Sequence, residues 1–283
     1  MNMNTMKRYT LLMVLLLIIS AFSATAQQQI IAIEGPNGKL ISDVFTPAVA
    51  AGEKKPIVII MHGFSANRQD PLVKAIYDEV ATNGLGAIKF DFDGHGESEG
   101  SFSDMTVPKE INDALAVYEY ARNLSWVSDI YFVGHSQGGV VASMTAGKLG
   151  AEKIAGIALL APAAVLRDDA LRGNLMGVSY DPINPPEFIT IYRGLKVGCQ
   201  YIKTAQTLPI YDTARLYQGP VLMLHGTADT IVPYTFSLHY NDIYNNGSLR
   251  LLHNVNHQFS NHRQEAAKSV ADYLIKTAGC YVL

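Results

Sequence analysis

The chain has 283 residues and a formal charge of −3, and 48% of its residues are hydrophobic against 17% charged. This composition is typical of a globular protein, and the length suffices for one large domain with a sizeable core. A mildly acidic chain without basic clusters argues against nucleic acid or an anionic membrane as a partner.

The first 26 residues have the three parts of a secretory signal peptide. Lys7 and Arg8 precede an apolar run over residues 11–19, and the sequence ATA at residues 24–26 matches the small-x-small pattern that signal peptidases cleave. The apolar run is too short to span a bilayer comfortably. We therefore expect residues 1–26 to be removed, and residues 27–283 to be exported to the periplasm or secreted, without membrane contact after cleavage.

Short apolar runs alternate with longer amphipathic ones along the rest of the chain. The predicted strands are 30–33, 40–45, 57–61, 87–90, 130–133, 157–160, 221–224 and 249–252. The predicted helices are 72–82, 107–124, 136–149, 235–244 and 263–277. From the third strand on, this order predicts an α/β fold with a mostly parallel eight-stranded sheet and helices on both faces. The first two strands are expected to form an antiparallel edge.

One interval breaks this alternation. About sixty residues separate the strand 157–160 from the strand 221–224, where an α/β unit needs only a helix and two short loops. Residues 165–206 show no clear period of 2 or 3.6 and contain the pair Pro185-Pro186. A structureless loop of this length is uncommon in a compact domain. The sequence therefore predicts an inserted cap of short helices or hairpins over about residues 163–217.

The pentapeptide GHSQG at residues 134–138 lies between a predicted strand and a predicted helix. In this context a G-x-S-x-G sequence puts its serine at the apex of a tight, strained turn, the nucleophile elbow. Glycine flanks the serine because a Cβ atom there would clash. Ser136 is therefore the candidate nucleophile, and the structural alternative is a buried serine that caps the following helix.

A catalytic serine needs a base, and the base needs an orienting acid. His257 lies in a loop just beyond the last predicted strand, whereas His253 lies at the end of that strand and His262 opens the final helix. Asp229 directly follows a predicted buried strand, although an aspartate in a turn is the common alternative. The chain order Ser136, Asp229, His257 is the one expected of α/β-hydrolases.

The oxyanion formed during acyl transfer needs hydrogen-bond donors, which we expect to be backbone amides. One is the N–H of Gln137, immediately after the nucleophile, and the other is the N–H of Phe64 in the sequence HGFS at residues 62–65. Gly63 lets the chain approach closely there. We expect His62 to be structural and to fix this loop through a hydrogen bond.

The sequence DFDGHGES at residues 91–98 combines glycines with clustered Asp, His and Glu. Such a cluster could hold a metal ion. A triad with an oxyanion hole needs no Lewis acid, so we predict no metal and no cofactor. We expect the loop to be a structural neighbour of the active site.

Cys199 and Cys280 are the two cysteines of the chain. An oxidising compartment would allow them to form a disulfide. Two separate buried thiols are the alternative, because the sequence does not reveal whether the residues meet.

The motifs HGF, DFDGHGESEG, GHSQGG, LLAPAA and HGTADTIVP together resemble the bacterial cinnamoyl (feruloyl) esterase branch of the α/β-hydrolase superfamily, over about residues 30–277. In that family the cap forms one wall of the acyl pocket, and polar cap residues hold the phenolic hydroxyl of ferulate, caffeate or coumarate. Carried over by motif, the resemblance implies Asp169 and Tyr201 as substrate-binding residues, with a solvated cap aspartate as the alternative for Asp169. Met176 stands where relatives have a glutamine that can assist this contact.

The resemblance implies a secreted serine carboxylesterase for hydroxycinnamate esters, as small molecules or linked to plant cell-wall polysaccharide. A lipase for monoacylglycerols and an acyl-peptide hydrolase use the same machinery and are the alternatives. A catalytically silent hydrolase fold that serves as a binding module is a third alternative, but such chains usually lack a triad member and this one has all three. The oligomeric state is left open, with a homodimer as one alternative.

Overall fold

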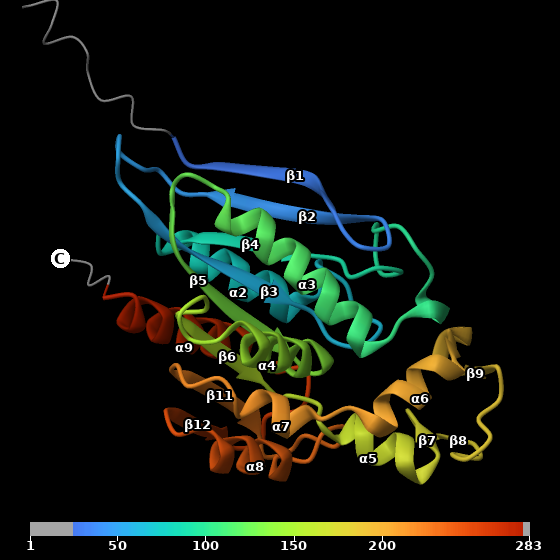
Figure 1. The fold of residues 1–283 in the computed structure, drawn as a ribbon. Helices are drawn as coiled ribbons and strands as arrows, with labels where there is room; N and C mark the ends of the chain where they lie inside the picture. Colours follow the sequence, from blue (N-terminus) through green and yellow to red (C-terminus); the bar gives the residue numbers. More distant parts are fainter. Residues whose placement is uncertain (1–24, 280–283) are drawn as a thin grey trace, which may run out of the picture.

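The structure, a computed structural model, describes residues 25–279 and contains one eight-stranded sheet in the spatial order β1-β2-β4-β3-β5-β6-β11-β12 (Figure 1). The strands from β4 to β12 pair in parallel, whereas β1–β2 and β2–β4 are antiparallel. The mostly parallel sheet with an antiparallel edge is confirmed. The strands are β1 (Gln27–Glu34), β2 (Lys39–Thr46), β3 (Lys55–Met61), β4 (Gly86–Phe90), β5 (Val127–His135), β6 (Gly156–Leu160), β11 (Val221–Gly226) and β12 (Gly247–Leu252).

Central strand β3 illustrates why the sheet needs helices on both faces. Successive side chains of a strand point to opposite faces, and in β3 both sets are apolar and buried. Ile57, Ile59 and Met61 belong to one hydrophobic cluster, whereas Val58 and Ile60 belong to the other. The core therefore has two layers, one on each face of the sheet.

Helices cover both layers (Figure 1). One face carries α2 (Pro71–Thr82) packed against α9 (Arg263–Thr277). The other face carries α3 (Val107–Arg122), α4 (Gln137–Leu149), α7 (Ile210–Ala214) and α8 (Thr235–Ile243). Helix α3 ends two residues before the predicted end, because Asn123 caps it and its side-chain amide donates to the Glu119 carbonyl. Among residues 25–279, no helix combines the length and hydropathy needed to cross a bilayer.

Short helices and two β-hairpins fill the interval between β6 and β11. They are α5 (Val165–Arg172), β7 (Asn174–Leu175), β8 (Val178–Ser179), β9 (Phe188–Thr190), η2 (Tyr192–Gly194), β10 (Lys196–Gly198) and α6 (Cys199–Thr207). We call this segment, residues 165–207, the cap; it projects from one end of the sheet (Figure 1). Large apolar side chains are exposed on it, namely Leu171, Met176, Ile183, Phe188 and Tyr192.

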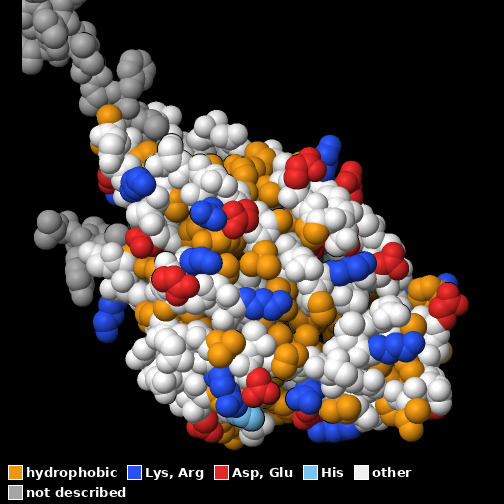
Figure 2. Space-filling view, in the orientation of Figure 1, with side chains coloured by type: hydrophobic (Ala, Val, Ile, Leu, Met, Phe, Trp, Pro, Cys, Tyr) orange, Lys and Arg blue, Asp and Glu red, His pale blue; other side chains and the backbone are white. Residues whose placement is uncertain are grey.

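The surface seen in Figure 2 mixes positive and negative side chains with apolar ones. Residues 1–24 of the expected signal peptide lie outside the described residues, and so does Cys280. Cys199 is the first residue of α6 and is half-buried, and the two alternatives for it, a disulfide with Cys280 or a separate thiol, both stay open.

Candidate active site

Ser136 lies in the turn between strand β5 and helix α4. Its backbone has φ 57° and ψ −122°, a conformation that a non-glycine residue adopts only under strain. A Cβ atom at Gly134 would lie 2.2 Å from the Gly138 carbonyl oxygen, and one at Gly138 would lie 2.3 Å from the His62 carbonyl oxygen. Both glycines are therefore required by close backbone approach. The Ser136 side chain makes no capping hydrogen bond to α4, which argues against the helix-cap alternative.

Three side chains from separate loops meet at the carboxyl ends of the strands. The Oγ atom of Ser136 lies 2.9 Å from Nε2 of His257, and Nδ1 of His257 lies 2.7 Å from Oδ2 of Asp229. A carboxylate accepts, so Nδ1 carries the hydrogen and Nε2 is left to accept the serine proton. The structure thus brings together the three residues expected to form a triad.

The side chain of Asp229 is a charged carboxylate, and both of its oxygens accept hydrogen bonds. Its Oδ1 accepts the backbone N–H groups of Ile231 at 2.9 Å and Val232 at 2.8 Å. Burial raises its pKa, but the hydrogen bonds from His225 and His257 outweigh burial and bring the pKa below its ordinary value. Asp229 therefore stays ionised when His257 takes up a proton.

Two further histidines support this arrangement, and sequence reasoning did not single them out. Nε2 of His135 donates to the His257 carbonyl oxygen at 2.9 Å, and burial lowers the pKa of His135 to about 4. Nε2 of His225 faces Oδ2 of Asp229 at 3.1 Å and the Val232 carbonyl oxygen at 2.9 Å, while its Nδ1 lies 2.6 Å from Oγ of Ser237. Both residues adjoin the glycines of motifs already recognised, GHSQG and HGTAD, and that position was the available signal.

The residues of the two expected oxyanion donors lie close to Ser136. Gln137 is the first residue of α4, so its N–H has no partner within the helix. Gly63 lies against the nucleophile, since a Cβ atom there would be 3.0 Å from the Ser136 Cβ. Phe64 follows directly and lines the same cavity as Ser136. This proximity to Ser136 is compatible with the expected oxyanion hole of backbone amides.

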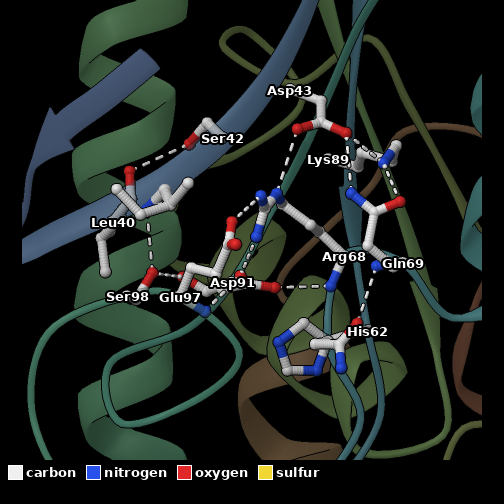
Figure 3. Close-up of polar contacts among 12 residues, drawn as sticks. Leu40, Ser42, Asp43, His62, Arg68, Gln69, Lys89, Asp91, Glu97 and Ser98 are labelled. Carbon is white, nitrogen blue, oxygen red and sulfur yellow. Dashed lines mark hydrogen bonds and ion pairs between the residues drawn. The ribbon is translucent and has the colours of Figure 1, made fainter. Parts of the chain in front are cut away.

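Ion pairs hold the segment that carries Phe64 (Figure 3). The buried Arg68 guanidinium contacts Asp43 with an Nε to Oδ1 distance of 3.0 Å, and it also contacts Asp91 and Glu97. Lys89 pairs with the second oxygen of Asp43. These residues come from the β3–α2 loop, from β2, from β4 and from the loop after β4. The cluster therefore fixes residues 63–68, which we call the oxyanion segment, to the sheet.

His62 makes hydrogen bonds within its own loop, as expected, and to the loop at residues 91–98. Nδ1 of His62 donates to the Gly63 carbonyl at 2.8 Å, and its Nε2 accepts the N–H of Phe92 at 3.2 Å. Burial and the nearby His95 keep the pKa of His62 well below its ordinary value. Within residues 25–279, no group of three or more His, Cys, Asp or Glu side chains is arranged to hold a metal ion.

A cavity of about 390 Å³ lies between the triad and the cap. Ser136 lines it, together with apolar side chains such as Leu166, Leu175 and Ile202. Asp169 from α5 and Tyr201 from α6 also line it. Burial raises the pKa of Asp169, although Arg172 opposes the change. Both cap residues expected to bind substrate therefore face the cavity of the nucleophile.

The other two histidines considered as the catalytic base are not part of this triad. His253 is exposed beyond the end of β12, and His262 precedes α9.

A second cavity, of about 660 Å³, shares Phe64, Met176 and Ile231 with the first. The two cavities therefore adjoin at these three residues.

Glu110 of helix α3 is another residue that sequence reasoning missed. It is 1% exposed and its Oε2 accepts from Nε2 of Gln137 at 2.8 Å. Oε1 of Gln137 in turn accepts from the Tyr201 hydroxyl at 2.8 Å. Helix α3, the elbow and the cap are thus joined by one chain of hydrogen bonds. Glu110 lies in no motif, and its contact with Gln137 spans 27 positions, so the sequence carried no signal for it.

Comparisons with known proteins agree with this geometry. Residues 52–179 match the family model described as serine aminopeptidase, S33, and residues 186–278 match the one described as TAP-like protein. Among curated proteins, the lysophosphatidylserine lipase ABHD12 of Danio rerio is 25% identical over 181 residues, which are 63% of this chain and 44% of that protein. Protein ABHD12B of Homo sapiens is 25% identical over 66% of this chain and 49% of its own length. The chain thus matches less than half the length of these relatives.

Among solved structures, Est1E from Butyrivibrio proteoclasticus with bound ferulic acid has a TM-score of 0.83 and 31% identity. The match covers 87% of this chain and 98% of that one. Alpha/beta hydrolase domain-containing protein 10 from mouse, at 19% identity and a TM-score of 0.67, shares the fold. The topology of the sheet, the nucleophile elbow, the chain order of the three triad residues and the similar proteins all indicate the same fold family. The chain belongs to the α/β-hydrolase superfamily.

Proposed function

We propose that this protein is a serine carboxylesterase that hydrolyses hydroxycinnamate esters through an acyl-enzyme. The observation that carries the proposal is the cavity at Ser136, whose largely apolar cap wall presents Asp169 and Tyr201. An aromatic acyl group fits an apolar wall, and a ring hydroxyl fits isolated polar groups. The likeness to Est1E, solved with ferulic acid bound, supports the same substrate class.

Acylation follows from the triad geometry. His257 takes the proton of Ser136 as Oγ attacks the ester carbonyl carbon, and Asp229 stabilises the imidazolium. The carbonyl oxygen gains negative charge and is held by the N–H groups of Phe64 and Gln137. The tetrahedral intermediate collapses, the carbon–oxygen bond to the alcohol breaks, and His257 gives its proton to the leaving alcohol.

Deacylation repeats the same steps with water. His257 removes a proton from a water molecule as the water oxygen attacks the acyl-enzyme carbonyl. When this second intermediate collapses, Ser136 Oγ leaves with the proton from His257 and the free acid is released.

The second cavity, which adjoins the first at Phe64, Met176 and Ile231, gives the alcohol part of the ester a place during acylation.

A lipase is the second candidate function, because the curated relatives named lysophosphatidylserine lipase share about a quarter of their matched residues with this chain. The experiment compares kcat/KM for methyl ferulate, caffeate, coumarate and sinapate with a medium-chain p-nitrophenyl ester, a monoacylglycerol and an aminoacyl anilide. We expect the hydroxycinnamates to be preferred. A preference for the acylglycerol or the anilide would support a lipase or an acyl-peptide hydrolase instead.

A non-catalytic binding module is tested separately. A fluorophosphonate probe should label Ser136 in the intact protein and leave Ser136→Ala unlabelled, because labelling requires an activated serine. Lack of labelling in the unaltered protein would support the binding module.

Export is a further part of the proposal and rests on residues 1–26 alone. Plant cell-wall material is the natural source of such esters that an exported enzyme would meet. Cell fractionation of the producing organism, followed by N-terminal sequencing, should find a protein that begins at Gln27. A cytoplasmic protein that keeps Lys7 and Arg8 would contradict export but not the esterase activity.

A further inference from the structure

The side chain of Gln137 connects two residues that lie on opposite sides of it. Its Nε2 donates to Oε2 of Glu110 at 2.8 Å, and its Oε1 accepts from the Tyr201 hydroxyl at 2.8 Å. All three side chains are buried, with exposed fractions of 3% or less. The backbone of Gln137 supplies an oxyanion donor, whereas its side chain serves this second purpose.

Two acceptors define which end of the Gln137 amide faces helix α3. Besides Glu110, Sδ of Met105 lies 3.5 Å from Nε2 of Gln137. A thioether sulfur can only accept, whereas a carboxyl group accepts when it is ionised and can also donate when it is protonated. The contact with Met105 therefore places the NH₂ end of Gln137 on this side, where it also donates to Glu110, and Oε1 faces Tyr201.

This orientation decides what Tyr201 can offer to a ligand. A tyrosine hydroxyl has a single proton, and here that proton is donated to Gln137. Tyr201 lines the cavity of Ser136, so an acyl group that reaches its hydroxyl would meet an oxygen with only lone pairs to offer. With the Gln137 amide reversed, Tyr201 would accept from Gln137 and could donate to the ligand.

We propose that Glu110 is a positioning residue that makes Tyr201 a hydrogen-bond acceptor, so that the site selects acyl groups whose ring carries a hydroxyl donor. The inference rests on the proposed function and adds to it the origin of selectivity for the ring substituent. A methyl ether at the same ring position has no proton to donate, and both oxygens would face each other without a bond. The site should therefore discriminate against such an ether more strongly than against its size alone.

The burial of Glu110 supports this role. A carboxyl group with 1% exposure is costly to keep in a protein interior unless its hydrogen bonds are satisfied. Burial raises the pKa of Glu110 well above its ordinary value, and the nearby Asp113 adds to that effect. The bond to Gln137 is the interaction that opposes this cost.

The test compares methyl 4-hydroxycinnamate with methyl 4-methoxycinnamate, which differ only in the ring donor. We expect the unaltered protein to prefer the hydroxy ester by about tenfold or more in kcat/KM, the size of one buried hydrogen bond. Glu110→Leu removes the acceptor and should lower this ratio by about tenfold, mainly through KM of the hydroxy ester. Glu110→Gln keeps an acceptor oxygen and should retain most of the ratio.

Controls separate positioning from general damage. Glu119→Leu alters an exposed glutamate on the same helix and should leave the ratio unchanged. Tyr201→Phe should lower the ratio alone, and adding Glu110→Leu should lower it little further, because the two act through one contact. If Glu110→Leu does not fold, as judged by its circular dichroism, Gln137→Leu removes the same bridge, keeps the backbone donor and should reproduce the loss.

Equal losses on both esters, or an unchanged ratio in Glu110→Leu or its replacement Gln137→Leu, would overturn the role of Glu110. Absence of any preference for the hydroxy ester in the unaltered protein, combined with poor turnover of both cinnamates, would instead contradict the proposed function. A protein that turns over both esters well but equally would overturn the inference alone.

Discussion

The two walls of the active site are built in different ways. On the sheet side, the triad carboxylate of Asp229 accepts from two backbone amides and two histidines, and Arg68 ties the oxyanion segment to three carboxylates. The cap combines the short helices α5 and α6 with strands of only two or three residues, and it leaves Met176 42% and Ile183 84% exposed. The bond-breaking groups are therefore held by many mutual contacts, whereas substrate selection depends on a segment with fewer constraints.

The largest expected effect tests the sheet wall directly. Ser136→Ala should lower kcat for methyl ferulate by about 10⁴-fold or more, by comparison with other triads. The cap is untouched by this change, so ferulate should still bind, which a fluorescence titration can measure. Near-native turnover by this variant would remove the mechanism.

Arg68→Met breaks the ion-pair cluster behind the oxyanion segment (Figure 3). Loss of one partner leaves buried carboxylates uncompensated, and we expect the free energy of unfolding to fall by about 3–5 kcal/mol. Urea unfolding measures the change. Arg122→Met is the matched control, because Arg122 pairs with Glu119 on the surface and should cost less than about 1 kcal/mol.

The carboxyl group of Asp113 predicts a pH dependence of stability. Burial raises its pKa to about 7, and the neighbouring Asp93 adds to the effect. The folded state then binds more protons than the unfolded state between the two pKa values. The contribution of Asp113 to the free energy of unfolding is therefore fully present below about pH 4, and it is lost as the pH rises through 7.

Asp113→Asn should remove part of this loss and raise the free energy of unfolding at pH 8 by on the order of 2 kcal/mol, with little gain at pH 4. Urea unfolding at both pH values measures it. Asp129→Asn, at an exposed position, should change neither value. A gain for Asp113→Asn that is equal at both pH values would show that packing, not titration, is responsible.

The smallest expected effect concerns the cap wall. Asp169→Ala should reduce the differences in kcat/KM among methyl ferulate, caffeate, coumarate and sinapate by about tenfold, because the polar contact of Asp169 with the ring substituents is lost. The preferred member should lose most. An unchanged profile would disconnect Asp169 from recognition and leave it as a solvated cap aspartate.

The sequence predicted what local pattern controls. Continuous apolar runs such as residues 57–61 marked the buried strands, and glycines at 134 and 138 marked the elbow where side chains do not fit. The triad followed because each member comes directly after a recognisable strand. These features depend on neighbouring residues, so they can be read without the fold.

The remaining parts depend on partners that are distant in the chain. Arg68 meets Asp43 and Asp91 across 25 and 23 positions, and Glu110 meets Gln137 across 27. Nothing next to these residues in the sequence indicates a buried charge. The hairpins of the cap were equally hidden, because strands as short as Asn174–Leu175 show no measurable alternation.

The positive φ of Ser136 has a consequence for the engineering of this protein. A residue held in so sparsely populated a conformation costs the fold on the order of 1–3 kcal/mol, and glycine would relieve most of that cost. A library selected only for survival of heating should therefore enrich glycine at position 136, and a library selected for product formation should eliminate it. Thermal tolerance and turnover are thus in direct competition at a single codon.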